Sequence, residues 1–246
     1  MIIAIANQKG GVAKTTSTIC LGGLLASASC LAIDLDPQGN LTTGLGIELA
    51  DDQLTAYHLI TERATAAQTI ISTSSKMSLI PADITLAKGE PEIISKVGNF
   101  SLLREALNEK ILKQYPFILI DCPPSLGLLT INALAAADYI LIPCQCQFFA
   151  LKGLTALLKT IETVQKRLNP NLKVLGVLPT MAEKTVMTQD IVASLRNDLP
   201  GVTIFDPVPK SVQFSEANVA GKAIHEYSRD PKLAAPYKSI VSFIKK

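Results

Sequence analysis

The segment that decides the fold stands near the start of the chain and reads Lys9-Gly10-Gly11-Val12-Ala13-Lys14-Thr15-Thr16. It follows the aliphatic run 2–6, which predicts a buried strand, and it precedes a helical pattern over residues 15–28. Paired glycines let the backbone curl so that successive N–H groups converge on an anion, and the helix adds the positive end of its dipole. Strand, glycine-rich turn and helix in this order predict a phosphate-binding loop.

Individual residues of this loop have separate roles. Lys14 can reach the terminal phosphates of a nucleotide, and the Thr15 hydroxyl is placed to ligate Mg²⁺. The strict P-loop pattern fails twice, because Gln8 replaces its first glycine and Ala13 precedes the lysine. A positive φ at residue 13 would cost alanine about 1–2 kcal/mol, so we expect a negative φ and intact nucleotide affinity. Lys9 either reaches across a dimer interface to the partner's nucleotide or is a surface lysine.

Short aliphatic runs alternate with longer helical patterns along the rest of the chain. The runs predict strands at 2–6, 31–34, 77–81, 117–121, 139–143 and 174–179, with a weaker candidate at 202–205. Helices are expected at 15–28, 100–114, 130–136, 151–168, 186–199 and 231–245. This alternation predicts an α/β fold: a doubly wound, mostly parallel sheet with helices on both faces. Because the sequence contains no repeat or linker-like tract, residues 1–246 are expected to form a single domain.

Composition narrows the class of protein further. The 246 residues are 48% hydrophobic and 18% charged, which argues against disorder and against a polar coiled coil. A net charge of +2 is too balanced to indicate a nucleic-acid partner by itself. The five cysteines lie in apolar runs, and Met1 leads directly into the first strand without a basic region, so we expect a cytoplasmic protein. The uncharged stretch between Lys14 and Asp34 fits a buried helix and strand better than a membrane span.

Acidic turns follow two of the predicted strands. Asp34-Leu35-Asp36-Pro37 ends the second strand, and Asp121-Cys122-Pro123-Pro124 ends the fourth. Ligands of such sheets bind beyond the carboxyl ends of the strands, so these turns could line the same pocket as the glycine-rich loop. Asp34 and Asp36 share a face if the strand continues; if it breaks at Pro37, Asp36 can turn towards a γ-phosphate. A helix cap or an Asx turn is the structural alternative for each carboxylate.

Three motifs together resemble a known family. They are Asn7-Gln8-Lys9-Gly10-Gly11-Val12-Ala13-Lys14-Thr15-Thr16, Ile33-Asp34-Leu35-Asp36-Pro37-Gln38-Gly39-Asn40 and Ile120-Asp121-Cys122-Pro123-Pro124-Ser125. They are similar to the deviant Walker motifs of the ParA/Soj partition ATPases, and the later segments 149–154, 176–181 and 209–217 agree, so the resemblance spans nearly the whole chain. The alanine at position 13 also makes the loop similar to that of the carboxysome-positioning, McdA-like members of that family.

The resemblance implies a role for each matching residue. Lys14 would be the P-loop lysine, Lys9 the signature lysine that acts on the partner's nucleotide, and Asp36 the residue that positions the attacking water. Mg²⁺ would be held by Thr15 and, through a water molecule, by Asp121. The loop 206–210 would flank the adenine. The implied nucleotide-binding residues are Lys9, Gly10, Gly11, Val12, Ala13, Lys14, Thr15, Thr16, Pro207 and Pro209.

The resemblance also implies a cycle. ATP would drive formation of a sandwich homodimer that binds DNA non-specifically, and Mg²⁺-dependent hydrolysis with slow intrinsic turnover would release it. A ParB-like or McdB-like adaptor would stimulate hydrolysis through a basic peptide and link the protein, associated with the nucleoid, to a plasmid, chromosome or carboxysome. Lys184 and Lys210 would contact DNA. Gln213 stands where close relatives carry a DNA-contacting arginine, which weakens the expected binding modestly.

Two other classes of function are open at this point. Nitrogenase-iron-protein relatives share the deviant loop and bridge a cluster with cysteines, and Cys144 and Cys146 lie two apart on one predicted strand. We favour buried small hydrophobic residues as the explanation. MinD-like relatives attach to membranes through a terminal amphipathic helix, and an apolar stripe recurs at helical spacing at Tyr237, Ile240, Val241 and Ile244. Such a stripe is more often core packing, so membrane binding is not expected.

Overall fold

A seven-stranded sheet forms the centre of the molecule in the computed structural model, which describes residues 1–147 and 150–245. The strand order is β3-β4-β2-β5-β1-β6-β7, and all neighbours are parallel except β3 and β4. The strands are β1 Ile2–Ile5, β2 Cys30–Asp34, β3 Ile71–Ser72, β4 Ser78–Ile80, β5 Phe117–Asp121, β6 Tyr139–Gln145 and β7 Lys173–Thr180. The mostly parallel sheet expected from the sequence is confirmed, with one short antiparallel strand added at its edge.

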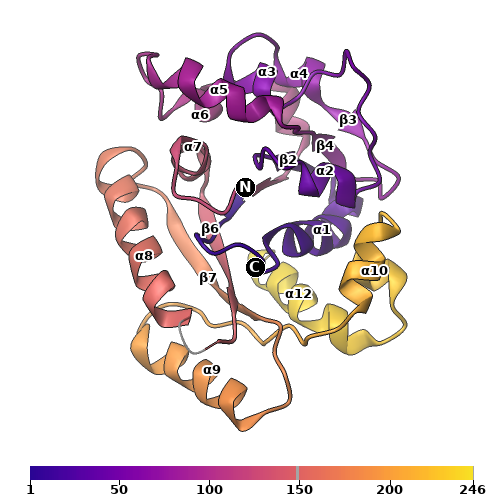
Figure 1. The fold of residues 1–246 in the computed structure, drawn as a ribbon, viewed down its shortest axis with the longest axis vertical. Coiled ribbons are helices and arrows are strands. Elements are labelled where there is room, and N and C mark those ends of the chain that lie inside the picture. The colour runs from indigo at the N-terminus through magenta and orange to yellow at the C-terminus, as the bar shows by residue number, and fades with distance from the viewer. Residues whose placement is uncertain (148–149, 246) are drawn as a thin grey trace.

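Helices cover both faces of the sheet (Figure 1). One buried apolar cluster joins α1, α10, α11 and α12 to one face, and a second joins α3 to α8 and part of α9 to the other. The helices are α1 Lys14–Leu25, α2 Asn40–Gly44, α3 Ala56–Ile60, α4 Ala66–Thr69, α5 Thr85–Ile94, α6 Leu102–Ala106, α7 Leu128–Ala136, α8 Ala150–Arg167, α9 Val186–Asp198, α10 Gln213–Val219, α11 Ile224–Tyr227 and α12 Pro231–Ile244. Phe149, just before α8, lies outside the described residues.

The register of the sheet places the polar turns together. Asp34 at the end of β2 pairs with Asp121 at the end of β5, and Asp121 also pairs with Ile5 at the end of β1. The three strands are buried along almost their whole length, as expected for central parallel strands that read as continuous aliphatic runs. The glycine-rich loop and both acidic turns therefore leave the sheet at the same edge.

Two expected elements differ from the structure. The helix expected over 100–114 is broken into α6 and a 3₁₀ segment, Lys110–Gln114. Glu109 between them is extended, and its carboxylate accepts hydrogen bonds from the N–H groups of Ala66 and Ala67, which cap α4. The weak strand candidate at 202–205 forms only an isolated bridge between Ile204 and Val177 of β7.

The last helix, α12, packs its apolar stripe into the core. Tyr237 and Ile240 are fully buried and Ile244 nearly so, and the Tyr237 hydroxyl lies 3.4 Å from Oγ of Ser17 on α1. This is the packing expected for the stripe, and it leaves those side chains unavailable to a bilayer. Among the helices of the described residues, none has the length and apolar character needed to cross a membrane.

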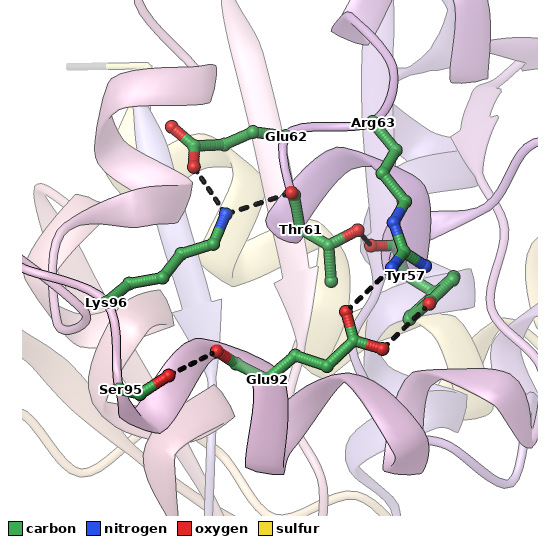
Figure 2. A network of polar contacts seen from close by, with 7 residues as sticks. All are labelled: Tyr57, Thr61, Glu62, Arg63, Glu92, Ser95 and Lys96. Carbon is green, nitrogen blue, oxygen red and sulfur yellow. Dashed lines mark hydrogen bonds and ion pairs between the residues drawn. The ribbon is translucent and has the colours of Figure 1, made fainter.

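A polar network fixes α5 against α3 (Figure 2). Glu92 of α5 forms an ion pair with Arg63 at 3.0 Å and accepts a hydrogen bond from the Tyr57 hydroxyl at 3.0 Å. Lys96, just beyond α5, forms an ion pair with Glu62 at 2.5 Å. These contacts hold the carboxyl-terminal end of α5 at a fixed position.

Candidate nucleotide-binding site

One cavity of about 650 Å³ lies at the sheet edge where the glycine-rich loop leaves β1. It collects residues from distant parts of the chain: the loop itself, the turn after β2, α2, the turn after β5, and α10. Its lining residues are Gly10, Gly11, Ala13, Lys14, Thr15, Thr16, Asp36, Asn40, Thr43, Gly44, Pro124, Met181, Asn218 and Val219. The structure thus brings Asp36 and most of the predicted phosphate loop to one hollow.

The expected negative φ at Ala13 is wrong. Ala13 has φ 66° and ψ 35°, the left-handed conformation, immediately before the first residue of α1. Gly11 is also left-handed, with φ 69°. Left-handed residues of this kind occur in loops whose successive N–H groups converge on an anion. The Ala13 carbonyl accepts the hydrogen bond from Ser17 N at 2.9 Å, in the first turn of α1. The loop therefore keeps its shape at a cost of about 1–2 kcal/mol for the Cβ of alanine.

Lys14 lies under the loop with 7% of its surface exposed. Its Nζ donates to the carbonyl of Lys9 at 3.2 Å, which curls the loop around the ammonium group. Burial lowers the pKa of Lys14, and the nearby Asp121, Cys122 and Asp36 oppose that shift. An anion in the cavity would stabilise the charged lysine in the same way.

Thr15 and Asp121 meet beside Lys14. The Thr15 hydroxyl donates to Oδ2 of Asp121 at 2.7 Å, and the Thr18 hydroxyl donates to Oδ1 at 3.3 Å. Asp121 is buried, and this burial together with the nearby Asp34 raises the pKa of the Asp121 carboxyl to about 8. A buried carboxylate with so little positive compensation, next to a hydroxyl ligand, suits a divalent cation with oxygen ligands.

Asp34 and Asp36 have different environments although they are two residues apart. The fully buried Asp34 carboxylate accepts from Asp36 N at 3.1 Å and from Thr42 N and Oγ1 at 2.9 and 2.8 Å. Burial raises the pKa of Asp34 to about 7. Asp36 instead lines the cavity, and its Oδ1 accepts from Gln38 N at 3.0 Å. Strand β2 therefore ends at Asp34, before the expected break at Pro37, and Asp36 lines the cavity as the second expected arrangement has it. Both carboxylates also accept hydrogen bonds from backbone N–H groups.

The Lys9 side chain makes its contacts outside the described lining of the cavity. It is exposed, and its Nζ donates to Oε1 of Gln145, the last residue of β6, at 3.2 Å and to Oε1 of Gln147, just beyond β6, at 2.5 Å. It is absent from the described lining, whereas Gly10 and Gly11 belong to it. This position agrees with the expectation that Lys9 does not share the phosphates with Lys14 of the same chain.

Pro207 and Pro209, expected to flank the adenine, are not among the described lining residues of the cavity. Met181, Asn218 and Val219 belong to that lining. Asn218 also donates from Nδ2 to Oγ1 of Thr16 at 3.3 Å. The sequence carried no pattern that would have selected Asn218, because α10 is short and reaches the loop only through the fold.

Lys184 and Lys210, expected to contact DNA, lie on neighbouring segments. Lys210 N donates to the carbonyl of Ala182 at 3.0 Å, next to the isolated bridge between Ala182 and Pro209. Lys210 forms an exposed ion pair with Glu183 at 2.6 Å, which lowers the pKa of Glu183. Both lysines are exposed, so the fold gathers a small basic surface there, partly neutralised by Glu183.

The cysteines and histidines have structural environments. All five thiols are free and buried, and burial raises the pKa of Cys144 and Cys146 to about 11. His58 accepts from Thr55 N at 3.1 Å and so caps α3, whereas Nδ1 of His225 is buried without a partner. Within the described part of the chain, no three His, Cys, Asp or Glu side chains group closely enough to hold a metal ion.

A parallel sheet, a glycine-rich loop, a buried lysine and a Thr–Asp pair at the strand ends define a P-loop nucleotide-binding protein. Comparison with known proteins narrows this class. Residues 1–174 match the family model described as "AAA domain". The chain is 43% identical over 235 residues to the sporulation initiation inhibitor protein Soj of Bacillus subtilis, covering 94% of this chain and 92% of Soj.

Two further proteins extend the comparison. The chromosome partitioning protein ParA of Caulobacter vibrioides is 42% identical over 231 residues, covering 92% of this chain and 86% of ParA. A solved complex of a Cyanothece McdA variant with ATP superposes with a TM-score of 0.92 at 27% identity, covering 99% of this chain and 96% of McdA. The chain therefore belongs to the ParA/Soj family of P-loop ATPases, as its motifs indicated, and it is an ATPase of the partition or positioning type.

Proposed function

We propose that residues 1–246 act as a single ATPase domain that positions a cargo over the nucleoid. ATP binding by two copies produces a sandwich dimer that binds DNA non-specifically, and hydrolysis stimulated by a ParB-like or McdB-like adaptor releases it. The observation that carries this proposal is the position of Lys9. Its exposed ammonium group does not belong to the described lining of the cavity that Lys14 lines, so it could exchange its contacts with Gln145 and Gln147 for a nucleotide held by a second copy.

The chemistry within one copy follows from the cavity. Transfer of the γ-phosphoryl group to water requires positioning and charge stabilisation more than covalent assistance. The loop N–H groups and the Lys14 ammonium hold the phosphates, and Asp36 orients the water whose oxygen bonds to the γ-phosphorus as the bond to the β-phosphate oxygen breaks. The partner's Lys9 adds positive charge to the same phosphates.

Mg²⁺ fits the residues beside the phosphates. Thr15 would ligate it and Asp121 would hold it through a water molecule, because these two groups already lie 2.7 Å apart and the cost of burying the Asp121 carboxylate exceeds the stabilisation that Lys14 gives it. The ion would neutralise charge that develops on the phosphate oxygens. McdA of Cyanothece, with ATP bound, shares the fold that presents these residues.

DNA binding and cargo selection depend on surfaces outside the cavity. We assign the DNA contact to Lys184 and Lys210, with Gln213 at the start of α10 as a neutral neighbour. Because each phosphate contact contributes about one unit to the salt dependence of binding, this small basic surface predicts weak, salt-sensitive binding by a single copy. Pairing two copies would double the number of contacts, which links DNA binding to ATP.

An Asp36→Ala substitution tests the proposal. We expect the variant to bind ATP, to lose turnover by about 100-fold because the water is no longer oriented, and to accumulate as DNA-bound dimer. Phosphate release, sedimentation with ATP and DNA mobility shift measure the three effects. Asp51→Ala, an exposed carboxylate outside the cavity, is the control. If Asp36→Ala hydrolysed ATP at the wild-type rate, Asp36 would not be the residue that orients the attacking water.

A further inference from the structure

The end of β7 contacts the phosphate loop from a distant part of the chain. Thr180 is the last residue of β7, and its side chain is fully buried. The Thr180 hydroxyl donates a hydrogen bond at 3.1 Å to the carbonyl of Val12, which lies 168 residues earlier in the sequence. Because Thr180 belongs to a strand of the sheet, this contact ties the loop to the centre of the molecule.

Two other carbonyls of the loop are held by α1. The Lys9 carbonyl accepts a hydrogen bond from Nζ of Lys14, and the Ala13 carbonyl accepts one from Ser17 N. Both donors belong to the helix that continues the loop, so they move with it. Thr180 therefore supplies a restraint on the loop that does not depend on α1.

The peptide between Val12 and Ala13 requires such a restraint. Gly11 and Ala13 are both left-handed, with φ 69° and 66°, and Val12 lies between them. Glycine adopts this conformation without cost, whereas alanine is strained in it. Rotation of the Val12–Ala13 peptide would let Ala13 take a negative φ, and strain of this kind persists only where the surroundings prevent the change. The hydrogen bond from Thr180 opposes the rotation because it holds the carbonyl of that peptide.

The orientation of the same peptide matters for the ligand. A trans peptide directs its C=O and its N–H to opposite sides, so the direction of the Val12 carbonyl sets the direction of the Ala13 N–H. Ala13 lines the nucleotide cavity, and the N–H groups of a glycine-rich loop are the donors that bind phosphate. Rotation would exchange the directions of the two groups and so change the donors that the loop offers to a phosphate.

Burial makes the Val12 carbonyl dependent on its partner. Val12 has 1% of its surface exposed, and Thr180 has 0%. A buried carbonyl that loses its donor is destabilised, because water does not replace the lost hydrogen bond. Loss of the Thr180 hydroxyl would therefore favour the same rotation that relief of the strain at Ala13 favours.

The surroundings of Thr180 also belong to the site. Met181, the next residue, has φ 52° and lines the nucleotide cavity. The Thr180 carbonyl accepts a hydrogen bond from Cys146 N at 3.1 Å. Thr180 also pairs with Gln145 of β6, whose side chain accepts a hydrogen bond from the Lys9 ammonium group. The end of β7 is thus held in place between the cavity and the partners of Lys9.

We propose that Thr180 is a positioning residue of the nucleotide site, whose hydroxyl holds the Val12–Ala13 peptide in the orientation that binds phosphate. Thr180 acts through the backbone of the loop, and the strain at Ala13 is what makes its restraint necessary. The proposal rests on the phosphate loop described above, and it is independent of dimer formation, DNA binding and the adaptor.

Titration of each variant with a fluorescent ADP analogue and Mg²⁺ tests the proposal, because ADP lacks the γ-phosphate to which the partner's Lys9 is assigned. Thr180→Val removes the hydroxyl at nearly constant side-chain volume. Thr180→Ala and Thr180→Ser also differ by a hydroxyl, so the test does not depend on the valine variant alone. Urea unfolding verifies that each variant is folded under the conditions of the titration.

Thr69→Val is the matched control. Thr69 is also fully buried, and its hydroxyl donates to the carbonyl of Ala66 at 3.0 Å. It does not belong to the described lining of the nucleotide cavity. The control therefore removes the same kind of hydrogen bond at a place that has no contact with the loop.

We expect Thr180→Val to raise the dissociation constant of the ADP analogue at least about tenfold, and Thr180→Ser and Thr69→Val to stay within about twofold of wild type. The strain provides a second measurement. In an Ala13→Gly background strain no longer favours the rotation, so the further change Thr180→Val should raise the dissociation constant by less than about threefold.

Three results would overturn the proposal. The first is wild-type affinity in a folded Thr180→Val or Thr180→Ala, and the second is a Thr180→Ser variant that binds as weakly as Thr180→Ala. The third is an equal loss of affinity with alanine and with glycine at position 13, because the loss would then not depend on the strained peptide. A wild-type chain that does not bind the analogue would refute the nucleotide site itself, and with it this role of Thr180.

Discussion

At the scale of single residues, Ala13 is the position at which local preference and site geometry conflict. The φ of 66° belongs to the conformation that glycine adopts without cost, yet the chain carries alanine there. Such strain persists only where the surroundings fix it, and here the loop is fixed by the Lys14 ammonium and by the start of α1. The strain is therefore part of the phosphate loop.

Replacing Ala13 by glycine should stabilise the protein. Relief of the left-handed strain outweighs the extra entropy of glycine in the unfolded chain, so we expect the free energy of unfolding to rise by about 0.5–1 kcal/mol. Urea unfolding measures the change. Ala87→Gly, an exposed position inside α5, should lose about 1 kcal/mol as the control. A loss of stability in Ala13→Gly would show that the residue is not strained.

The buried carboxyl of Asp121 predicts a pH dependence of stability in metal-free, nucleotide-free buffer. Its pKa is raised from 3.8 to about 8 in the folded chain, so the folded state binds more protons than the unfolded state between those values. Stability should therefore fall as pH rises through that window. Between about pH 6 and pH 9, wild type should lose more unfolding free energy than Asp121→Asn, measured by urea titration. An equal or larger loss in Asp121→Asn would contradict this expectation.

At the scale of elements, α1 is held at close range by its neighbours. A Cβ at Gly23 would lie 2.6 Å from the Cβ of Ala223 and 3.0 Å from Cε1 of His225. Glycine at this position thus lets the segment around α11 pack directly on the helix that carries Lys14 and Thr15. The position of α1, and with it the phosphate loop, depends on that contact.

A single added methyl group tests this packing. Gly23→Ala should lower the free energy of unfolding by about 1–3 kcal/mol through overpacking, even though alanine favours helix. Gly153→Ala in α8, where nothing lies within 4 Å of the new Cβ, should instead gain about 0.5–1 kcal/mol. Thermal or urea unfolding of the two variants gives the comparison. If the free energy of unfolding of Gly23→Ala rose instead, the segment around α11 would have moved aside for the added methyl group at little cost.

The central strands and the short helices differ in how well the sequence predicts them. The central strands were predictable because each is a continuous aliphatic run bounded by turn residues, as at residues 117–121. The strand at 77–81 was also predictable, but the short helices between β2 and β5 were not, because α2, α3 and α4 are four or five residues long and show no helical period. The break at Glu109 depends on its contacts with the distant start of α4, which no local pattern carries.

At the scale of the whole molecule, the site forms because parallel strands end at one edge. The motif residues Lys14, Thr15, Asp36 and Asp121 were predictable, since each follows a strand or a glycine-rich turn. Thr42 and Asn218 lie on segments that only the fold brings to the site, so the sequence pointed to neither of them. The proposed cargo and adaptor would be selected on surfaces of this kind, so the sequence motifs define the chemistry better than the partners.

Self-association in the presence of ATP and Mg²⁺ tests the central claim most directly. Lys9 of one copy is expected to reach the nucleotide of the other, so sedimentation should show dimers for Asp36→Ala with ATP and single chains for the double variant Lys9→Ala, Asp36→Ala. Lys222→Ala, an exposed lysine outside the cavity, should behave like its parent in the same background. ATP-dependent dimers that form equally well without Lys9 would contradict the claim.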